Sequence, residues 1–250
     1  MILYLSSATA YPVYDDLLNK GLVYAGYQAQ KFNHTLIKGL SNFDKVVSVS
    51  ALPYVNVKAD EIKHVEDNTE FYSVKNSQGF LRKFTRLFSV KKLAERIIKK
   101  SKPDYIICDA IVAPSSYAAI KLGKKYKIPT VAIVTDLPQA MVNGGIGGIG
   151  GYITKKYLEK YDYYVLLTKD MNEVVNKRGK PFVVMGGVCD PVNVSATEKA
   201  TPKTLVYTGS LWKREAGLEY FTEGFLKANI DNAELHFYGT GEWVDELKEI

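Results

Sequence analysis

The residues best suited to chemistry lie near the end of the chain, where an apolar run at 205–207 meets a turn. The turn places a glycine, a hydroxyl and two cations before a helical pattern: Gly209, Ser210, Lys213 and Arg214. Glycine lets a ligand approach the backbone, a helix N-terminus carries partial positive charge, and the cations match an anionic diphosphate. The segment indicates a diphosphate site, with ordinary strand-to-helix turn chemistry as the alternative.

A second turn of this kind follows the next apolar run. The apolar run 233–238 is followed by Gly239 and Gly241, and another helical pattern begins after these glycines. Two glycine turns at the ends of neighbouring strands favour a shared anion site more than one turn alone. We expect both turns to contribute to the diphosphate site.

One carboxylate stands in a position suited to acid–base work. Asp136 comes just after the apolar run 130–135, where it could orient or deprotonate an acceptor hydroxyl. The alternative is a turn or cap aspartate before Pro138. Asp109 follows an apolar run in the same way. We take Asp136 as the catalytic candidate.

A glycine-rich loop follows Asp136. Residues 145–150, GIGGIG, formally match the dinucleotide fingerprint, but they do not lie between the first strand and its helix, so NAD or FAD binding is not predicted. The loop is interpreted as a mobile acceptor loop that orders over a substrate, or as a plain flexible connection. Its candidate residues are Asn143, Gly144, Gly145, Gly147 and Gly148.

Residues 80–102 have the pattern of a basic amphipathic helix. Nine cations, among them Arg82, Lys83 and Arg86, stand against the single acid Glu95, and apolar residues recur at helical spacing. Anionic lipid headgroups attract such a face by about 1 kcal/mol per well-placed charge. The prediction is a membrane-facing helix, with a solvated helix that packs on the sheet as an equal alternative. No nucleic-acid signature is visible.

These residues need a scaffold in which strands and helices alternate. Apolar runs predict strands at 2–6, 45–50, 105–108, 130–135, 163–167 and 182–185, and helices near 22–40, 80–100, 113–126 and 170–176. The strands lack in–out alternation, which is typical of a parallel sheet covered on both faces. The candidate residues then lie at carboxyl ends of strands, where doubly wound α/β folds bind ligands.

The composition is that of a globular chain and excludes several classes. Of 250 residues, 46% are hydrophobic, and the net charge of +6 points to an anionic partner. The N-terminal apolar run breaks at Ser6 and no run reaches about 18 residues, so neither a signal peptide nor a membrane span is predicted. Cys108 and Cys189 are interpreted as reduced, cytosolic thiols. The three histidines lack metal-ligand spacing, so no metal is predicted.

The polar segment 190–202 has the composition of a linker, which places a domain boundary near Thr201. Residues 1–200 are then one complete Rossmann-like domain with its linker. Residues 201–250 supply only the first βαβ part of a second Rossmann-like domain, because about 50 residues are too few for a full parallel sheet. We therefore expect a C-terminally truncated chain.

Several passages resemble bacterial family-4 glycosyltransferases, which are retaining enzymes of the GT-B fold. Residues 207–225, YTGSLWKREAGLEYFTEGF, are similar to the start of the family's C-terminal domain. Residues 161–175 and 182–191 resemble its passage out of the first domain, and 127–138, KIPTVAIVTDLP, resembles the preceding strand and loop. The resemblance covers nearly the whole chain.

The resemblance implies roles for the candidate residues. Gly209, Lys213 and Arg214 would lie near the donor diphosphate, and Asp136 would face the acceptor at the interdomain cleft. The family's pair of glutamates would lie beyond Ile250. Glu215 and Glu223 share the spacing of that pair, but they fall on the first helix of the second domain.

The implied activity is transfer of a hexose from a nucleotide-sugar donor to a lipid-linked or polysaccharide acceptor, with retention. The protein would be cytoplasmic and peripheral at the inner face of the cell membrane, in polysaccharide biosynthesis, with no bound cofactor and no nucleic-acid partner. Two alternatives stay open: a GT-B sugar-nucleotide epimerase, and a non-catalytic module that binds an acceptor or a partner. The 250-residue chain is expected to be inactive if the missing residues are needed.

Overall fold

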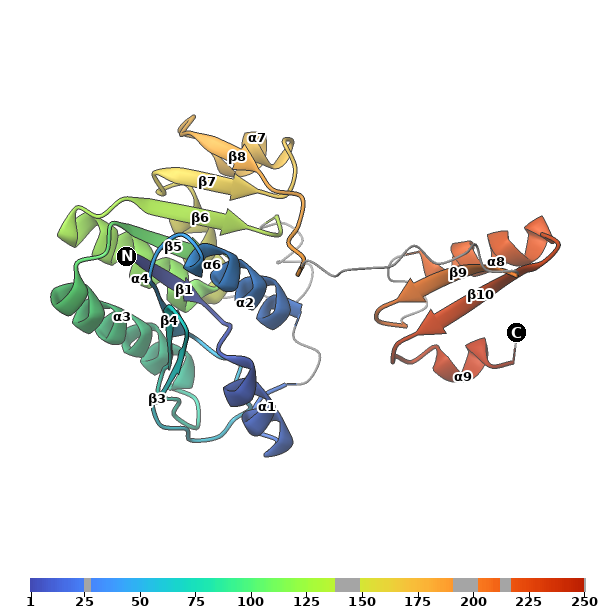
Figure 1. The fold of residues 1–250 in the computed structure, drawn as a ribbon, viewed down its shortest axis with the longest axis horizontal. Helices are drawn as coiled ribbons and strands as arrows, with labels where there is room; N and C mark the ends of the chain where they lie inside the picture. Colours follow the sequence, from blue (N-terminus) through green and yellow to red (C-terminus); the bar gives the residue numbers. More distant parts are fainter. Residues whose placement is uncertain (25–27, 138–148, 191–201, 212–216, 250) are drawn as a thin grey trace. The chain divides into compact units, whose positions relative to one another are not determined.

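The computed structural model describes residues 1–24, 28–137, 149–190, 202–211 and 217–249. Their contacts divide the chain into two compact units, Met1–Asp190 and Pro191–Ile250, which we call the first and second units. Figure 1 shows both units as α/β structures. The boundary predicted near Thr201 stays a prediction, because residues 191–201 lie outside the described ranges.

The first unit is built on an eight-stranded sheet with the order β3-β4-β2-β1-β5-β6-β7-β8. All its neighbouring strands run parallel except β3 and β4, which form an antiparallel hairpin at one edge. The strands are β1 (Ile2–Ser6), β2 (Val46–Ser50), β3 (Ile62–Glu66), β4 (Thr69–Ser73), β5 (Tyr105–Asp109), β6 (Thr130–Val134), β7 (Tyr163–Leu166) and β8 (Phe182–Val184).

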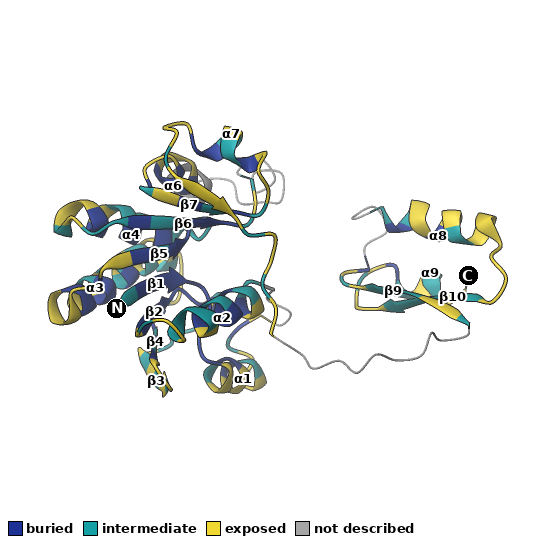
Figure 2. Ribbon diagram, turned by 45° about the horizontal axis from the view of Figure 1, so that its top comes forward, coloured by how far each residue is buried: buried dark blue, intermediate teal, exposed yellow. Residues whose placement is uncertain are grey.

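Helices cover both faces of this sheet (Figure 1). The described helices of the unit are α1 (Tyr11–Asn19), α2 (Gln28–Ser41), α3 (Arg82–Ser101), α4 (Ala113–Tyr126), α6 (Ile149–Leu158) and α7 (Met171–Val175). Leu3 and Leu5 of β1 belong to a core with Val90 of α3, whereas Tyr4 between them packs in a second core with Ile37 of α2. The central strands are therefore buried from both sides, as Figure 2 shows.

The predicted α/β fold is confirmed, and the structure adds three elements that the sequence analysis did not predict. The first is α1, which begins at Tyr11 with a proline in its first turn. The second is α6, which begins within the glycine-rich run 145–150 that was interpreted as a loop. The third is the β3–β4 hairpin. Its edge strand β3 alternates between half-buried and exposed residues, so it lacks the continuous apolar run of the other strands.

The second unit contains β9 (Lys203–Thr208), α8 (Leu218–Ala228), β10 (Ala233–Tyr238) and α9 (Val244–Leu247). Strands β9 and β10 pair in parallel. Leu211, Leu218 and Trp243 form a small core with half-buried neighbours. Val206 and Tyr238 are 57% and 59% exposed, so part of the strand pair faces solvent in this unit.

Two further features bear on the predicted class. None of the helices in the described ranges combines the length and the apolar character that crossing a bilayer requires. Cys108 and Cys189 are both free thiols, and they differ in environment because Cys108 is buried in β5 whereas Cys189 is exposed. Burial raises the pKa of the Cys108 thiol well above its usual value.

Candidate functional site

The carboxyl ends of the parallel strands bring polar residues to one edge of the first sheet. The chain order reverses between β1 and β5, since β2 lies on one side of β1 and β6 lies beyond β5. In open α/β sheets, such a switch point is where ligands bind. Strands β4, β2, β1 and β5 end in Ser73, Ser50, Ser6 and Asp109, and Asp136 follows Thr135 after the end of β6. We call this the carboxyl edge.

A buried hydrogen-bonded chain underlies the carboxyl edge. The Tyr4 hydroxyl donates to Oδ1 of Asn33 at 2.7 Å, and Nδ2 of Asn33 donates to Oδ2 of Asp109 at 2.9 Å. Each of the three residues is at most 1% exposed. The other carboxyl oxygen of Asp109 is buried without a hydrogen-bond partner among the described residues. A carboxyl group held in this way carries a desolvation cost that core packing does not require.

The environment of Asp109 shifts its titration toward neutral pH. Burial raises the pKa of the Asp109 carboxyl to about 6, the Asn33 hydrogen bond opposes the shift, and the nearby charge of Asp136 adds to it. Asp136 itself is exposed after β6, whereas Asp109 lies beneath the surface. Two carboxyl groups of unlike burial at a switch point are a pattern typical of functional sites.

The loop after β1 is fixed by side chains from other elements. The amide of Gln30 in α2 forms two bonds with Thr9, accepting from its N–H at 2.9 Å and donating to its carbonyl at 2.6 Å. Ser115 of α4 donates to the Ser6 carbonyl at 3.2 Å. These bonds satisfy buried backbone groups of the loop and tie it to α2 and α4 next to Asp109.

The two glycine turns of the second unit lie against each other. The Gly209 N–H donates to the Tyr238 carbonyl at 3.0 Å, and the Leu211 N–H donates to the Thr240 carbonyl at 2.9 Å. A Cβ atom at Gly239 would collide with the Gly209 carbonyl oxygen, and one at Gly241 would collide with the Leu211 carbonyl. These glycines are therefore required for packing of one turn on the other, whether or not a ligand binds there.

Part of the predicted site lies outside the described residues. This holds for Lys213 and Arg214 of the first glycine turn, and for the acceptor loop Asn143, Gly144, Gly145, Gly147 and Gly148. Ser210 is described and exposed. The structure thus brings Gly209, Ser210, Gly239 and Gly241 together in the second unit and places Asp136 on the first.

The basic helix α3 exposes apolar residues at its N-terminal end. Phe80, Leu81 and Phe88 are 90%, 63% and 60% exposed, and Lys83 is exposed beside them. Arg82 is half-buried, and Arg86 donates its guanidinium to the carbonyls of Ala51 and Leu52. Arg86 thus ties α3 to the loop after β2, which leaves Arg82 and Lys83 as the cations beside the exposed apolar residues.

Tyr4 and Asn33 are the site residues that sequence reasoning did not find. Tyr4 lies within an apolar strand pattern, and Asn33 lies within a helix, 76 residues before the carboxylate it contacts. Their roles depend on how α2 packs over β1, which no local pattern encodes. Among the described residues there is also no group of three His, Cys, Asp or Glu side chains that could hold a metal ion.

No protein-family model matches the chain, and no curated protein matches it significantly in sequence. Solved structures do match. The lipopolysaccharide outer core galactosyltransferase WaaB, in its apo form, superposes with a TM-score of 0.58 and 14% identity over 99% of this chain and 63% of the other. Sucrose-phosphate synthase from Thermosynechococcus elongatus gives 0.57 and 14% identity over 95% of this chain and 62% of the other.

A third structure, the UDP-forming α,α-trehalose-phosphate synthase from Burkholderia vietnamiensis, gives a TM-score of 0.52 and 12% identity over 99% of this chain and 66% of the other. The chain thus spans less than two thirds of the length of each of these proteins. At this identity the similarity shows the fold: the chain has the Rossmann-like units of GT-B glycosyltransferases.

Proposed function

We propose that this protein is a glycosyltransferase that moves a hexose from a nucleotide-sugar donor to an acceptor hydroxyl, with retention of configuration, as its resemblance to family 4 implies. The observation that carries the proposal is the carboxyl edge, where buried Asp109 and exposed Asp136 lie at the switch point of a GT-B-type sheet. The fold supports this reaction class, and the two carboxyl groups offer chemistry suited to a hydroxyl acceptor.

The acceptor half of the proposed site lies on the first unit. Asp136 orients or deprotonates the acceptor hydroxyl, because it is the exposed carboxylate of the pair. Asp109 is a positioning residue, since its buried charge acts through Asp136 rather than on the substrate directly. The loop with Asn143, Gly144, Gly145, Gly147 and Gly148 is proposed to close over the acceptor.

The donor half of the proposed site lies on the second unit. Gly209 and Ser210 offer backbone and hydroxyl groups, with Gly239 and Gly241 as the turn behind them, and Lys213 and Arg214 neutralise the departing diphosphate. That charge is the largest one that develops during transfer, so its stabilisation contributes most to the rate. A UDP-forming enzyme among the similar structures supports a nucleotide-sugar donor. We propose no bound metal or other cofactor.

We also propose that the acceptor is lipid-linked or part of a polysaccharide, and that the protein acts at the cytoplasmic face of the cell membrane. The exposed Phe80, Leu81 and Phe88 beside Lys83 support this, because apolar side chains next to cations are typical of interfacial helices. One similar structure is a galactosyltransferase of the lipopolysaccharide outer core, which supports an acceptor of this class.

The primary test is release of nucleoside diphosphate from a panel of sugar nucleotides by the protein in its natural full length, with a lipid-extract acceptor. Release that depends on the acceptor supports the transferase, and no release across the panel overturns it. Conversion of the donor sugar without release would instead indicate an epimerase.

Two variants test the proposed roles at the level of single residues. Asp136→Asn should reduce kcat/KM by about 100-fold, whereas the exposed control Asp170→Asn should leave it within about two-fold. Lys213→Ala with Arg214→Ala should weaken donor binding by about ten-fold, while the exposed control pair Lys227→Ala with Lys248→Ala should not. If a variant and its control had equal effects, the role proposed for the residues changed in that variant would be wrong.

The membrane proposal has its own test. Co-sedimentation with anionic vesicles should fall after Arg82→Gln with Lys83→Gln and after Phe80→Ser, since both charge and apolar insertion contribute to interfacial binding. The matched control is Lys99→Gln with Lys100→Gln, which removes the same charge from the other end of α3. Unchanged binding in all three variants would show that α3 is only structural.

A further inference from the structure

A basic pocket lies at the amino ends of the strands of the first sheet, on the side opposite the carboxyl edge. It has a volume of about 950 Å³ and is lined where α4 ends, where α6 leads into β7, and in the turn before β8. Thr130 and Tyr163, the first residues of β6 and β7, form part of its wall, so the pocket belongs to the amino ends of these strands. We call it the amino-edge pocket.

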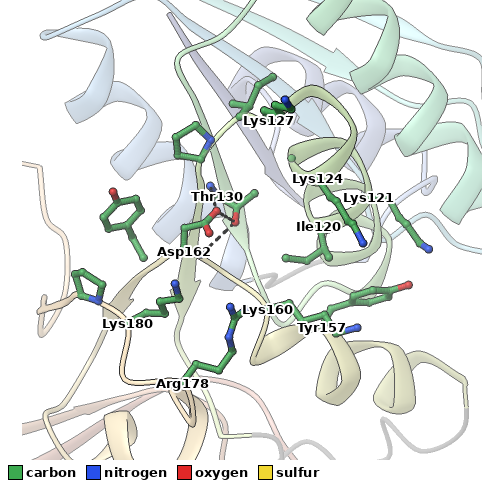
Figure 3. Close-up of a pocket in the computed structure, with 15 residues that line it drawn as sticks. Ile120, Lys121, Lys124, Lys127, Thr130, Tyr157, Lys160, Asp162, Arg178 and Lys180 are labelled. Atoms are coloured by element: carbon green, nitrogen blue, oxygen red, sulfur yellow. Dashed lines mark hydrogen bonds between the residues drawn. The ribbon is translucent and has the colours of Figure 1, made fainter.

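Six cations line the amino-edge pocket against one acid. Figure 3 shows Lys121 and Lys124 of α4 across the pocket from Arg178 and Lys180 of the turn before β8. The complete set of cations is Lys121, Lys124, Lys127, Lys160, Arg178 and Lys180. Among the described residues none of the six forms an ion pair with a carboxylate. By contrast Lys125, which follows Lys124 in α4, pairs with Glu95 of α3 at 2.6 Å.

The single acid of the pocket, Asp162, has a structural partner. Its Oδ2 accepts from the N–H and the hydroxyl of Thr130 at 3.0 and 2.9 Å, which joins the turn after α6 to the start of β6. The carboxylate is therefore held against the sheet, and its single charge offsets only one of the six cations.

Neutralisation of helix ends does not account for so many cations. Helices α4 and α6 both end at this edge, and each C-terminus carries about half a negative charge. Together with Asp162 they amount to about two negative charges, which leaves a surplus of about four positive charges around one cavity. A surplus of this size in a pocket with protein walls focuses the positive potential on whatever occupies it.

We propose that the amino-edge pocket binds a multiply phosphorylated ligand, with Arg178, Lys160, Lys121 and Lys124 contacting phosphoryl oxygens from two sides. A guanidinium recognises phosphate through paired hydrogen bonds, and lysines add mobile point charges. Two or three linked phosphoryl groups match the surplus charge and fit the volume. A free polyphosphate carries such groups in one molecule, and neighbouring phospholipid headgroups present one phosphoryl group each. This inference concerns the opposite edge of the sheet and does not rest on the proposed transferase activity.

Calorimetry with inorganic triphosphate tests whether the pocket binds a free polyphosphate. Triphosphate should bind the 250-residue chain, and Lys160→Gln with Arg178→Gln should weaken binding by about ten-fold. Both residues are exposed, so the fold should tolerate the change. The control Lys99→Gln with Lys100→Gln has the same net charge and should stay within about two-fold of the parent. In a second readout, bound triphosphate should protect Lys121 and Lys124, but not Lys99, from acetylation.

Vesicle binding tests whether the pocket binds phospholipid headgroups. Co-sedimentation is measured on an Arg82→Gln, Lys83→Gln background, so that α3 does not contribute, with phosphatidylcholine vesicles with or without phosphatidylglycerol. Binding that needs the anionic lipid and is lost with Lys160→Gln and Arg178→Gln identifies a headgroup, whereas triphosphate binding alone identifies a free ligand. If the pocket variant equals its charge-matched control in both arms, the proposal is overturned.

Discussion

The two halves of the proposed site, one on each unit, are held in shape by different means. On the first unit, side chains hold one another: Tyr4 bonds to Asn33, and Asn33 bonds to Asp109. On the second unit, backbones hold one another, since the turns at Gly209 and Gly239 exchange main-chain bonds and leave no room for a Cβ atom. The shape of the first half therefore depends on hydrogen bonds between buried side chains, and the shape of the second half depends on glycines, which have no side chain.

This difference determines which perturbation each half should resist. A half made of polar side chains responds to protonation and to loss of a single donor, because each buried group depends on its partner. A half made of packed backbone is indifferent to most side-chain changes and intolerant of added atoms. Both tryptophans of the chain, Trp212 and Trp243, lie in the second unit, so their fluorescence reports on that unit alone.

The largest effect should come from Gly239→Ala. The new methyl group meets the Gly209 carbonyl, a backbone atom that cannot swing aside, so the two turns must separate. We expect a loss of about 3 kcal/mol or more from the unfolding free energy of the second unit. Because a unit of this size is only marginally stable, its tryptophan fluorescence transition should lose cooperativity. The measurement is a urea titration followed at both tryptophan fluorescence and far-UV circular dichroism.

Gly224→Ala is the matched control for that experiment. Gly224 lies within α8 with open space around the position of a Cβ atom, so alanine should stabilise the second unit by up to about 1 kcal/mol. If both variants shift the fluorescence transition in the same direction and by the same amount, close packing of the turns does not hold the second half together.

Asp109→Asn should produce the next largest effect, and its sign depends on pH. The raised pKa means that folding favours the protonated carboxyl, so this group's contribution to stability is present below its ordinary pKa of 3.8 and is lost as pH rises through about 6. A neutral asparagine avoids that loss. We expect the variant to gain about 1–3 kcal/mol in the first unit at pH 8 and nothing near pH 4, with activity reduced at neutral pH.

Circular dichroism melts at the two pH values measure the stability change. A variant that is less stable at both pH values would mean that Asp109 contributes to packing. That result would contradict the conclusion that protonation of a buried side chain controls the first half. A gain in stability at pH 8 without loss of activity would agree with the raised pKa of Asp109 but would contradict its proposed role in the reaction.

Tyr4→Phe should cost less, about 1 kcal/mol of the first unit's unfolding free energy, because it leaves Oδ1 of Asn33 without its donor. The informative quantity is its coupling to Asp109→Asn in a double-mutant cycle, since both residues bond to Asn33. The control is Tyr164→Phe, which removes an equally buried hydroxyl that donates to the Leu158 carbonyl. Coupling for Tyr164→Phe as strong as for Tyr4→Phe would show that no local network exists.

The smallest effect should come from Ser210→Ala, at below about 0.5 kcal/mol. Ser210 is exposed, and it contributes its backbone carbonyl, which accepts from the Tyr207 hydroxyl at 3.1 Å. The fluorescence transition of the second unit should therefore not move. A loss above about 1 kcal/mol would mean that side chains also hold this half, contrary to the comparison.

Much of the scaffold could be predicted from sequence because strands of a buried parallel sheet are recognisable as continuous apolar runs. Strands β1, β5 and β6 appear within a residue or two of their predicted bounds, and α4 matches at both ends. One missed element is α6, whose glycine-rich start was interpreted as a loop. The others, α1 and the β3–β4 hairpin, are elements whose apolar residues are shared between core and solvent. Their weaker periodicity resembled that of loops.

The site was only partly predictable for a related reason. Asp109 and Asp136 can be placed because a strand's carboxyl end is a local property of the sequence. Asn33 cannot, because its contact with Asp109 forms only after α2 packs over β1. For Gly239 and Gly241, the close approach of a ligand that the sequence indicated stays a prediction, and the structure adds the close approach of another turn.

The contrast between the two cysteines also makes the protein easy to label. Cys108 is sealed in β5 and its thiol pKa is raised by burial, so a maleimide should leave it untouched in the folded state. Cys189 is exposed near the end of the first unit, which gives the unmodified chain a single attachment point for a dye. Energy transfer from the tryptophans of the second unit to that dye would then report the distance between the dye and the second unit, without any engineered residue.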